Sequence, residues 1–223
     1  MRACILTLAL LLTSIPALAQ EAPESVEEIA RTMIARAGAA DVFVVATDQN
    51  MAQFPRIRHV PSGLICVFSP RFEGEVVIYE NSPTLARGDD VGCNAQSMFD
   101  TQSLYATRVS PGLTLAQDFE ITLLAIRQRY AEAQPYLAPP SPAALPVRAI
   151  DDIERMRASF IVGDIFTHVS LAHVDGWAVK LRLTGPAATA QILDNRADMA
   201  FWQAVRAMIR TRAEIAPAPS DAN

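Results

Sequence analysis

Residues 166–184 read FTHVSLAHVDGWAVKLRLT. In this stretch, two β-prone runs flank the dipeptide Asp175-Gly176. Such a dipeptide favours a two-residue hairpin turn, because a type I′ turn needs positive φ at both central residues. We therefore predict a hairpin over about 159–184. Pairing outward from the turn joins Val174 with Trp177, Ala172 with Val179, Ser170 with Leu181, and His168 with Leu183.

The two faces of this hairpin differ in character. The face that carries Trp177 is mostly apolar, so we expect it to pack against the core. The opposite face is mixed and includes His173, Lys180 and Arg182. We interpret it as a possible partner-contact face. Lys180 is also the only lysine in the sequence.

Helical and strand patterns continue on both sides of the hairpin. Helices are predicted over about 25–37, 114–130, 151–157 and 195–212, the first and second with capping-box spacing and the last capped by Asn195. Strands are predicted over 42–46, 56–60, 64–68, 76–79 and 104–109, and a Pro-rich surface loop over 135–147. This order indicates an α+β fold: a mainly antiparallel sheet flanked by amphipathic helices, that is, an α/β/α sandwich.

The Asp-Gly-Trp turn, the strand AVKLRLT after it and the closing amphipathic helix resemble the PsbP-like α/β/α sandwich. The likeness spans about residues 40–212. Members of that fold are mostly non-enzymatic adaptor, assembly or binding proteins, so the resemblance implies a binding role. The stretch HVPSGLIC at 59–66 is also similar to secreted bacterial proteins of unknown activity.

The N-terminus has the three parts of a secretory signal peptide: a charged start, a short apolar run and small residues before Gln20. We predict cleavage after Ala19, a flexible leader over 20–24, a single domain over 25–215 and a disordered tail over 216–223. No second long apolar stretch follows, so no transmembrane anchor is expected. The Ala-rich signal and the preference for Arg over Lys favour the periplasm of a Gram-negative bacterium.

Two cysteines, Cys66 and Cys93, remain after the predicted cleavage. In an oxidising compartment such a pair predicts a disulfide. Cys66 lies on a predicted strand, and Cys93 follows the turn sequence at 88–90. The alternative is a free catalytic thiol with a histidine partner.

Composition excludes several classes of function. The net charge is −5, whereas nucleic-acid-binding domains are usually basic. No glycine-rich loop precedes a helix, so no nucleotide cofactor is expected. No zinc site is expected either, because His168 and His173 are five residues apart on a strand and point to opposite faces. Asp89 and Asp90 lack the spaced oxygen donors of a calcium loop and are interpreted as a solvated turn.

Three residues are weak candidates for catalysis: His59, Ser62 and His168. His59 and Ser62 are close in sequence, but no GxSxG elbow is present and Pro-Ser-Gly is common in turns. His168 lies on the apolar face of the hairpin and is interpreted as a hydrogen-bonded core or edge residue. We therefore expect an exported, non-catalytic protein that binds another periplasmic or envelope component. The alternatives are a small hydrolase that uses a histidine with a serine or a carboxylate, and a carrier of a small apolar ligand. The oligomeric state is not predictable.

Overall fold

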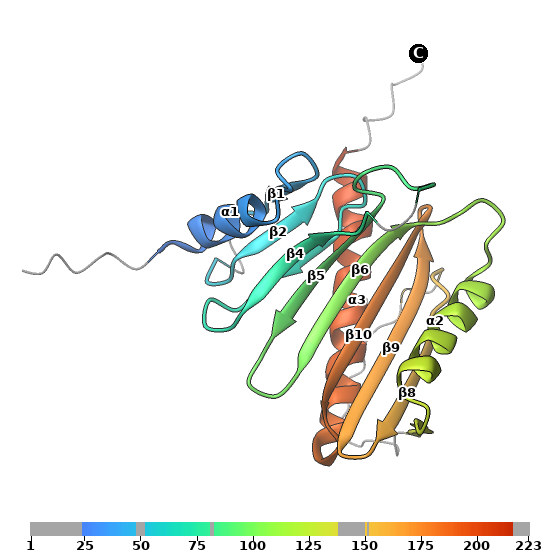
Figure 1. The fold of residues 1–223 in the computed structure, drawn as a ribbon. Coiled ribbons are helices and arrows are strands. Elements are labelled where there is room, and N and C mark those ends of the chain that lie inside the picture. Colours follow the sequence, from blue (N-terminus) through green and yellow to red (C-terminus); the bar gives the residue numbers. More distant parts are fainter. Residues whose placement is uncertain (1–23, 48–51, 81–82, 138–149, 151, 216–223) are drawn as a thin grey trace, which may run out of the picture.

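The computed structural model describes residues 24–47, 52–80, 83–137, 150 and 152–215. The strands are β1 Phe43–Val45, β2 Arg56–His59, β3 Ile65–Val67, β4 Gly74–Ile78, β5 Asp90–Gln96, β6 Thr101–Arg108, β7 Gln134–Pro135, β8 Met156–Val162, β9 Ile165–Val174 and β10 Trp177–Pro186. They form a seven-stranded sheet of order β4-β5-β6-β10-β9-β8-β7 and a three-stranded sheet of order β1-β2-β3 (Figure 1). All neighbouring strands are antiparallel.

The predicted hairpin is confirmed and lies inside the larger sheet, between β6 and β8. Asp175 and Gly176 have φ angles of 49° and 79°, so both central residues adopt the left-handed conformation that the turn requires. The register matches the prediction in all four pairs. The hairpin was predicted to begin near Ser159, but that residue lies in β8, which pairs with β9 across a separate tight turn at Gly163.

The larger sheet carries a helix on each face (Figure 1). These helices are α2 (Leu115–Arg129) and α3 (Ala190–Ile215). One face packs on α3 in the main core, which includes Trp177, Val179, Leu181, Leu183, Phe201, Val205 and Met208. The other face packs on α2 through Phe119, Leu123, Ile126, Val169, Leu171 and Ala178. Alternate residues of β10 thus enter different cores, which confirms the α+β sandwich.

The smaller sheet packs with α1 (Val26–Arg36) beside β4. Ser25 caps this helix by accepting a hydrogen bond from the Glu28 backbone N–H at 3.2 Å. The predicted disulfide is present between Cys66 of β3 and Cys93 of β5, and both residues are buried. The covalent bond therefore joins the two sheets.

Several predicted elements need correction. Residues 90–96 form a seven-residue strand, so Cys93 lies within a strand and not just after a turn. Residues 152–155 are not helical, and β8 begins at Met156. Asn195 lies inside α3, which begins at Ala190 after a 3₁₀ turn over Ala187–Thr189.

The predicted signal peptide, most of the leader, most of the Pro-rich loop and the C-terminal tail lie outside the described residues. The first residue of that loop, Pro135, forms the edge strand β7 together with Gln134, and proline is tolerated at the edge of a sheet. Within the part of the chain that the structure describes, no helix is long and apolar enough to cross a bilayer.

Candidate functional site

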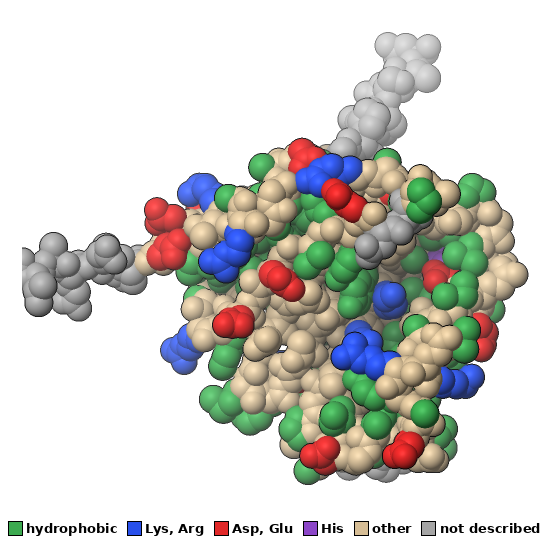
Figure 2. Space-filling model, viewed as in Figure 1, with side chains coloured by type: hydrophobic (Ala, Val, Ile, Leu, Met, Phe, Trp, Pro, Cys, Tyr) green, Lys and Arg blue, Asp and Glu red, His purple; other side chains and the backbone are tan. Residues whose placement is uncertain are grey.

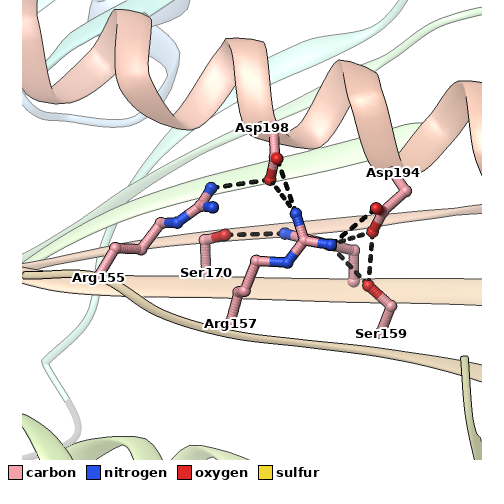
Figure 3. A network of polar contacts seen from close by, with 7 residues as sticks. Arg155, Arg157, Ser159, Ser170, Asp194 and Asp198 are labelled. Carbon is pink, nitrogen blue, oxygen red and sulfur yellow. Dashed lines mark hydrogen bonds and ion pairs between the residues drawn. The ribbon is translucent and has the colours of Figure 1, made fainter. Parts of the chain in front are cut away.

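A buried polar network connects β8 and β9 with α3 (Figure 3). Nδ1 of His168 lies 3.1 Å from Oδ1 of Asp194 and 2.9 Å from Oγ of Ser159. Nε2 of the same ring lies 2.8 Å from Oγ of Ser170, two residues further along β9. Ser159 donates a hydrogen bond to Asp194 at 2.7 Å. Two adjacent strands and one helix therefore hold four polar side chains in contact beneath the sheet.

Arg155, directly before β8, and Arg157 of β8 extend this network toward the surface (Figure 3). Arg157 donates to Oδ2 of Asp194 at 2.8 Å and to Asp198 at 2.7 Å. Arg155 donates to the same Asp198 carboxylate at 2.7 Å. Asp194 and Asp198 are one helical turn apart on α3, so both carboxylates lie on one face of the helix and contact Arg157.

Asp194 is the electrostatic centre of the network. Burial alone would raise the pKa of this carboxyl group. Hydrogen bonds from His168 and Ser159 and the charge of Arg157 outweigh burial and lower the pKa to about 2. Asp194 is therefore ionised at neutral pH, and the network holds a buried negative charge that is well compensated.

Ser170, His168 and Asp194 have the connectivity of a catalytic triad, with serine on one ring nitrogen and carboxylate on the other. A nucleophile must also reach a substrate. The exposed fractions of Ser170 and His168 are 0%, and that of Asp194 is 3%. None of the three lines any of four surface cavities formed by the described residues. As folded, the arrangement links secondary-structure elements and is closed to substrates.

The structure brings His59 and Ser62 together, as their spacing suggested. Nδ1 of His59 lies 2.8 Å from Oγ of Ser62, and both side chains are fully buried. Ser62 also accepts a hydrogen bond from the Leu64 backbone N–H at 3.1 Å, as a turn residue does. The ring of His59 packs against Phe43 and, edge to face, against Trp177. The pair lies within the apolar core.

Burial lowers the pKa of His59 to about 4, and the neighbouring Arg108 acts in the same direction. The Gly88 backbone and the charge of Asp89 oppose this shift without cancelling it. The imidazole is therefore neutral at neutral pH. Among the described residues, no carboxylate lies within salt-bridge distance of this ring, so no third group orients it for base catalysis.

The three residues of the mixed hairpin face lie on the side of the sheet that carries α2. His173 is held by this helix, with Nε2 3.0 Å from Oδ2 of Asp118. Lys180 lies over the ring of Tyr105, and Arg182 lies 5.7 Å from the ring centre of Tyr130. Because α2 covers β9, these residues do not form one continuous open surface. Lys180 borders a hollow instead.

This hollow, which we call the outer cavity, lies between α2 and the β4–β5 side of the sheet and has a volume of about 330 Å³. Figure 2 views the molecule from this side. Its polar lining includes Tyr79, Asp90, Tyr105, Thr107, Asp118 and Lys180, and its apolar walls include Leu85, Leu113 and Leu171. The volume lies within the usual range for small-molecule pockets.

Asp90 and the two tyrosines form the base of the outer cavity. Burial raises the pKa of Asp90, although a hydrogen bond from Thr107 at 2.7 Å and the charge of Lys180 oppose the shift. Burial and the neighbouring Tyr105 and Asp90 raise the pKa of Tyr79 to about 12, so its hydroxyl remains protonated. Asp90 was interpreted as part of a solvated turn; this is wrong, because it begins β5 and is half-buried.

His168 stands out in the sequence, but the partners that hold it were not predicted. One signal was present: Ser170 lies two residues from His168 on the face that otherwise faces the core, and polar residues there need buried partners. Asp194 and Asp198, at i and i+4 on the last helix, were the matching signal. Recognising Asp194 would have required the predicted helix to begin earlier than Asn195.

No group of three or more histidine, cysteine, aspartate or glutamate side chains that could hold a metal ion occurs among the described residues. No protein-family model matches the sequence, and no curated protein matches it. The chain is similar in structure to cyanobacterial PsbP (CyanoP) from Synechocystis sp. PCC 6803, with a TM-score of 0.47 and 13% sequence identity. The match covers 70% of this chain and 93% of that chain. This similarity agrees with the expected resemblance to the PsbP-like fold, and it bears on the fold alone.

Proposed function

We propose that this chain is an exported, non-catalytic binding protein of the bacterial periplasm. The observation that carries the proposal is the contrast in accessibility between its polar sites. The serine–histidine arrangements around His59 and His168 are sealed inside the protein, whereas the outer cavity, with Lys180 at its edge, opens to solvent. Binding at an accessible polar hollow needs no reactive group, which fits a protein that recognises another component of the envelope.

The absence of catalysis is tested with a fluorophosphonate probe, which labels activated serines. We expect no adduct on the native protein, because Ser62 and Ser170 are fully buried. An adduct mapped to either serine, lost in Ser170→Ala or Ser62→Ala while the fold is retained, would overturn the proposal. A tryptic map of the unfolded protein serves as the control for coverage of both serines.

Partner contact is tested through Lys180, which an amine-reactive crosslinker can address together with the α-amino group. We expect crosslinking in periplasmic extract to give one reproducible partner band. That band should be lost in Lys180→Gln and weakened in Arg182→Gln. Arg127→Gln, an exposed site on the solvent side of α2, should leave it unchanged. A band that is equally strong in all three variants would show that contact occurs elsewhere.

A small hydrolase is the second candidate, favoured by the distances around Ser170, His168 and Asp194. Such an activity would require α3 to move away from the sheet and expose the serine. It therefore predicts turnover that His168→Gln and Ser170→Ala each abolish. The probe experiment above separates this candidate from the binding role.

A further inference from the structure

Asp90 and Lys180 face the outer cavity from strands that are not neighbours. Strand β6 lies between them: Asp90 of β5 pairs with Thr107, and Lys180 of β10 pairs with Tyr105. Thr107 and Tyr105 are two residues apart, so both charges are on the same face of the sheet. Their backbones are two strand spacings apart across the sheet and two residues apart along it, or roughly 12 Å. Both side chains line the cavity.

The two charges do not meet directly. Asp90 accepts a hydrogen bond from Thr107, and the ammonium of Lys180 lies 4.7 Å from the centre of the Tyr105 ring. Among the described residues, no ion pair within 4 Å joins the carboxylate to the ammonium group. The two half-buried charges are therefore not paired with each other among the described residues.

The other charged residues of the lining already have partners. Asp118 contacts His173 at 3.0 Å. Arg108 lies 3.4 Å from Asp89 and stacks 3.9 Å from the centre of the Trp177 ring. Lys180 and Asp90 are thus left as one positive and one negative group, and the lining favours a ligand without net charge.

We infer that the outer cavity binds a small zwitterion, an α-amino acid, whose ammonium group contacts Asp90 and whose carboxylate contacts Lys180. Charge-assisted hydrogen bonds of this kind are about twice as strong as neutral ones. A neutral polyol would leave both half-buried charges without an opposite charge. A zwitterion provides a group of opposite charge for both Asp90 and Lys180.

The walls of the cavity indicate which side chain the amino acid carries. Leu85, Leu113 and Leu171 provide apolar contacts, and the ring centres of Tyr79 and Tyr105 lie 5.9 Å apart. An amino acid with an uncharged, apolar side chain fits such walls, because a further charge would be desolvated there without a partner. We therefore expect leucine or phenylalanine to bind more tightly than glutamate or lysine.

This inference rests on the proposed binding role and specifies its ligand. The experiment is calorimetric titration of the purified protein with each of the twenty amino acids. The best ligand is then compared with its N-acetyl and amide derivatives, which each remove one charge. We expect either derivative to bind about 10- to 100-fold more weakly, as for loss of a hydrogen bond to a charged group. This comparison uses the unaltered protein and does not depend on a variant that must fold.

Variants locate the site. Asp90→Asn and Lys180→Gln should each weaken binding of the best amino acid by about 10- to 100-fold. The matched controls are Glu73→Gln and Arg127→Gln, which change exposed charges outside the lining and should leave affinity unchanged. Reductive ¹³C-methylation of Lys180 adds a single side-chain NMR signal, which should shift when the amino acid binds.

The following outcomes would overturn the inference. They are no binding of any amino acid to the folded protein, equal affinity for the N-acetyl or amide derivative, and binding that persists unchanged in both Asp90→Asn and Lys180→Gln. Tight binding of methyl glucoside, included as a neutral polyol, would also overturn it. None of these results affects the proposed non-catalytic role, which fails only if Ser62 or Ser170 is labelled or substrate is turned over.

Discussion

His168 connects three elements through its two ring nitrogens, and Asp194 is the charge on which this connection depends. We predict that Asp194→Asn lowers the free energy of unfolding by about 3 kcal/mol, because it leaves Arg157 without its buried counter-charge. Urea denaturation at pH 7 measures the change.

Asp198→Asn is the matched control, one turn further along α3 and facing the same arginines. Its side chain is 23% exposed, against 4% for Asp194, so its loss should be clearly smaller. Equal losses in the two variants would contradict a special role for the buried carboxylate.

We predict that His59 makes the free energy of unfolding depend on pH in the acid range. Its pKa is about 4 in the folded protein and near 6.5 in an unfolded chain, so the unfolded state binds more protons between these values. Stability is therefore fully present above pH 6.5 and falls as the pH drops toward 4, by about 3 kcal/mol for this single group.

The measurement is urea denaturation of the wild type and of His59→Gln at several pH values between 4 and 7. The variant removes the titrating group, so its stability should change less with pH over this range. Asp194 does not contribute to the change in stability over this range. Its pKa is about 2 in the folded protein, so the stability that it provides is lost only as the pH falls below the ordinary carboxyl pKa of 3.8. Parallel pH profiles would show that His59 is not the group responsible.

At the residue scale, spacing in the sequence predicted contacts between residues that are close in the chain. It missed contacts between residues that are far apart in the chain. The contact of His59 with Ser62 spans three residues and belongs to a turn, so it is visible in sequence. The contacts of His168 with Asp194 and of Asp90 with the cavity depend on how α3 and β5 are placed. No local pattern contains that information.

The disulfide is the main feature at the scale of elements, because it joins β3 of the smaller sheet to β5 of the larger. We predict that Cys66→Ala together with Cys93→Ala lowers the free energy of unfolding by about 3–4 kcal/mol, the value for a closed loop of this length in the chain-entropy model. Urea denaturation of the oxidised wild type and the double variant measures it.

The reduced wild type lacks the disulfide but keeps both cysteine side chains, so it controls for the effect of the alanine substitutions. Its free energy of unfolding should resemble that of the double variant. Thiol titration of the denatured, unreduced protein should find no free cysteine in the mature chain. If reduction left the transition midpoint unchanged, the bond would not contribute to stability.

Elements were predictable where one strong local signal existed. Asp175-Gly176 allowed both the turn and the register to be predicted, and the capping box of Thr114 and Gln117 marked the start of α2. Strand β5 was missed because DVGCNAQ contains glycine and polar residues that are uncommon in strands. Gly92 is needed there: a Cβ would lie 3.0 Å from the ring of Tyr79 and 3.2 Å from that of Tyr105.

At the scale of the whole molecule, export is the prediction on which compartment and oxidation state depend. We expect the protein recovered from a Gram-negative periplasm to begin at Gln20, as measured by intact mass and N-terminal sequencing. Ala19→Arg, which removes the small residue required before the cleavage site, should leave the precursor uncut. Recovery of the uncleaved chain from the cytosol with two free mature thiols would contradict the prediction.

The overall architecture could be predicted because the order of hydrophobic periods identifies an α+β sandwich without knowledge of the side-chain contacts. The division of the strands into two sheets could not be predicted from the sequence. The runs over 42–68 and those over 74–108 have the same strand-like pattern, and only their pairing separates them. Strand pairing between distant segments depends on the packed structure as a whole.

The bond between Cys66 and Cys93 also has a consequence for chains that are not transported. In a reducing compartment both thiols stay free, so the segment before residue 68 is connected to the rest only by packing and backbone. Such a chain opens more often and exposes cleavable peptide to proteases. Oxidation of Cys66 and Cys93 makes this opening rarer, because the bond ties β3 to β5.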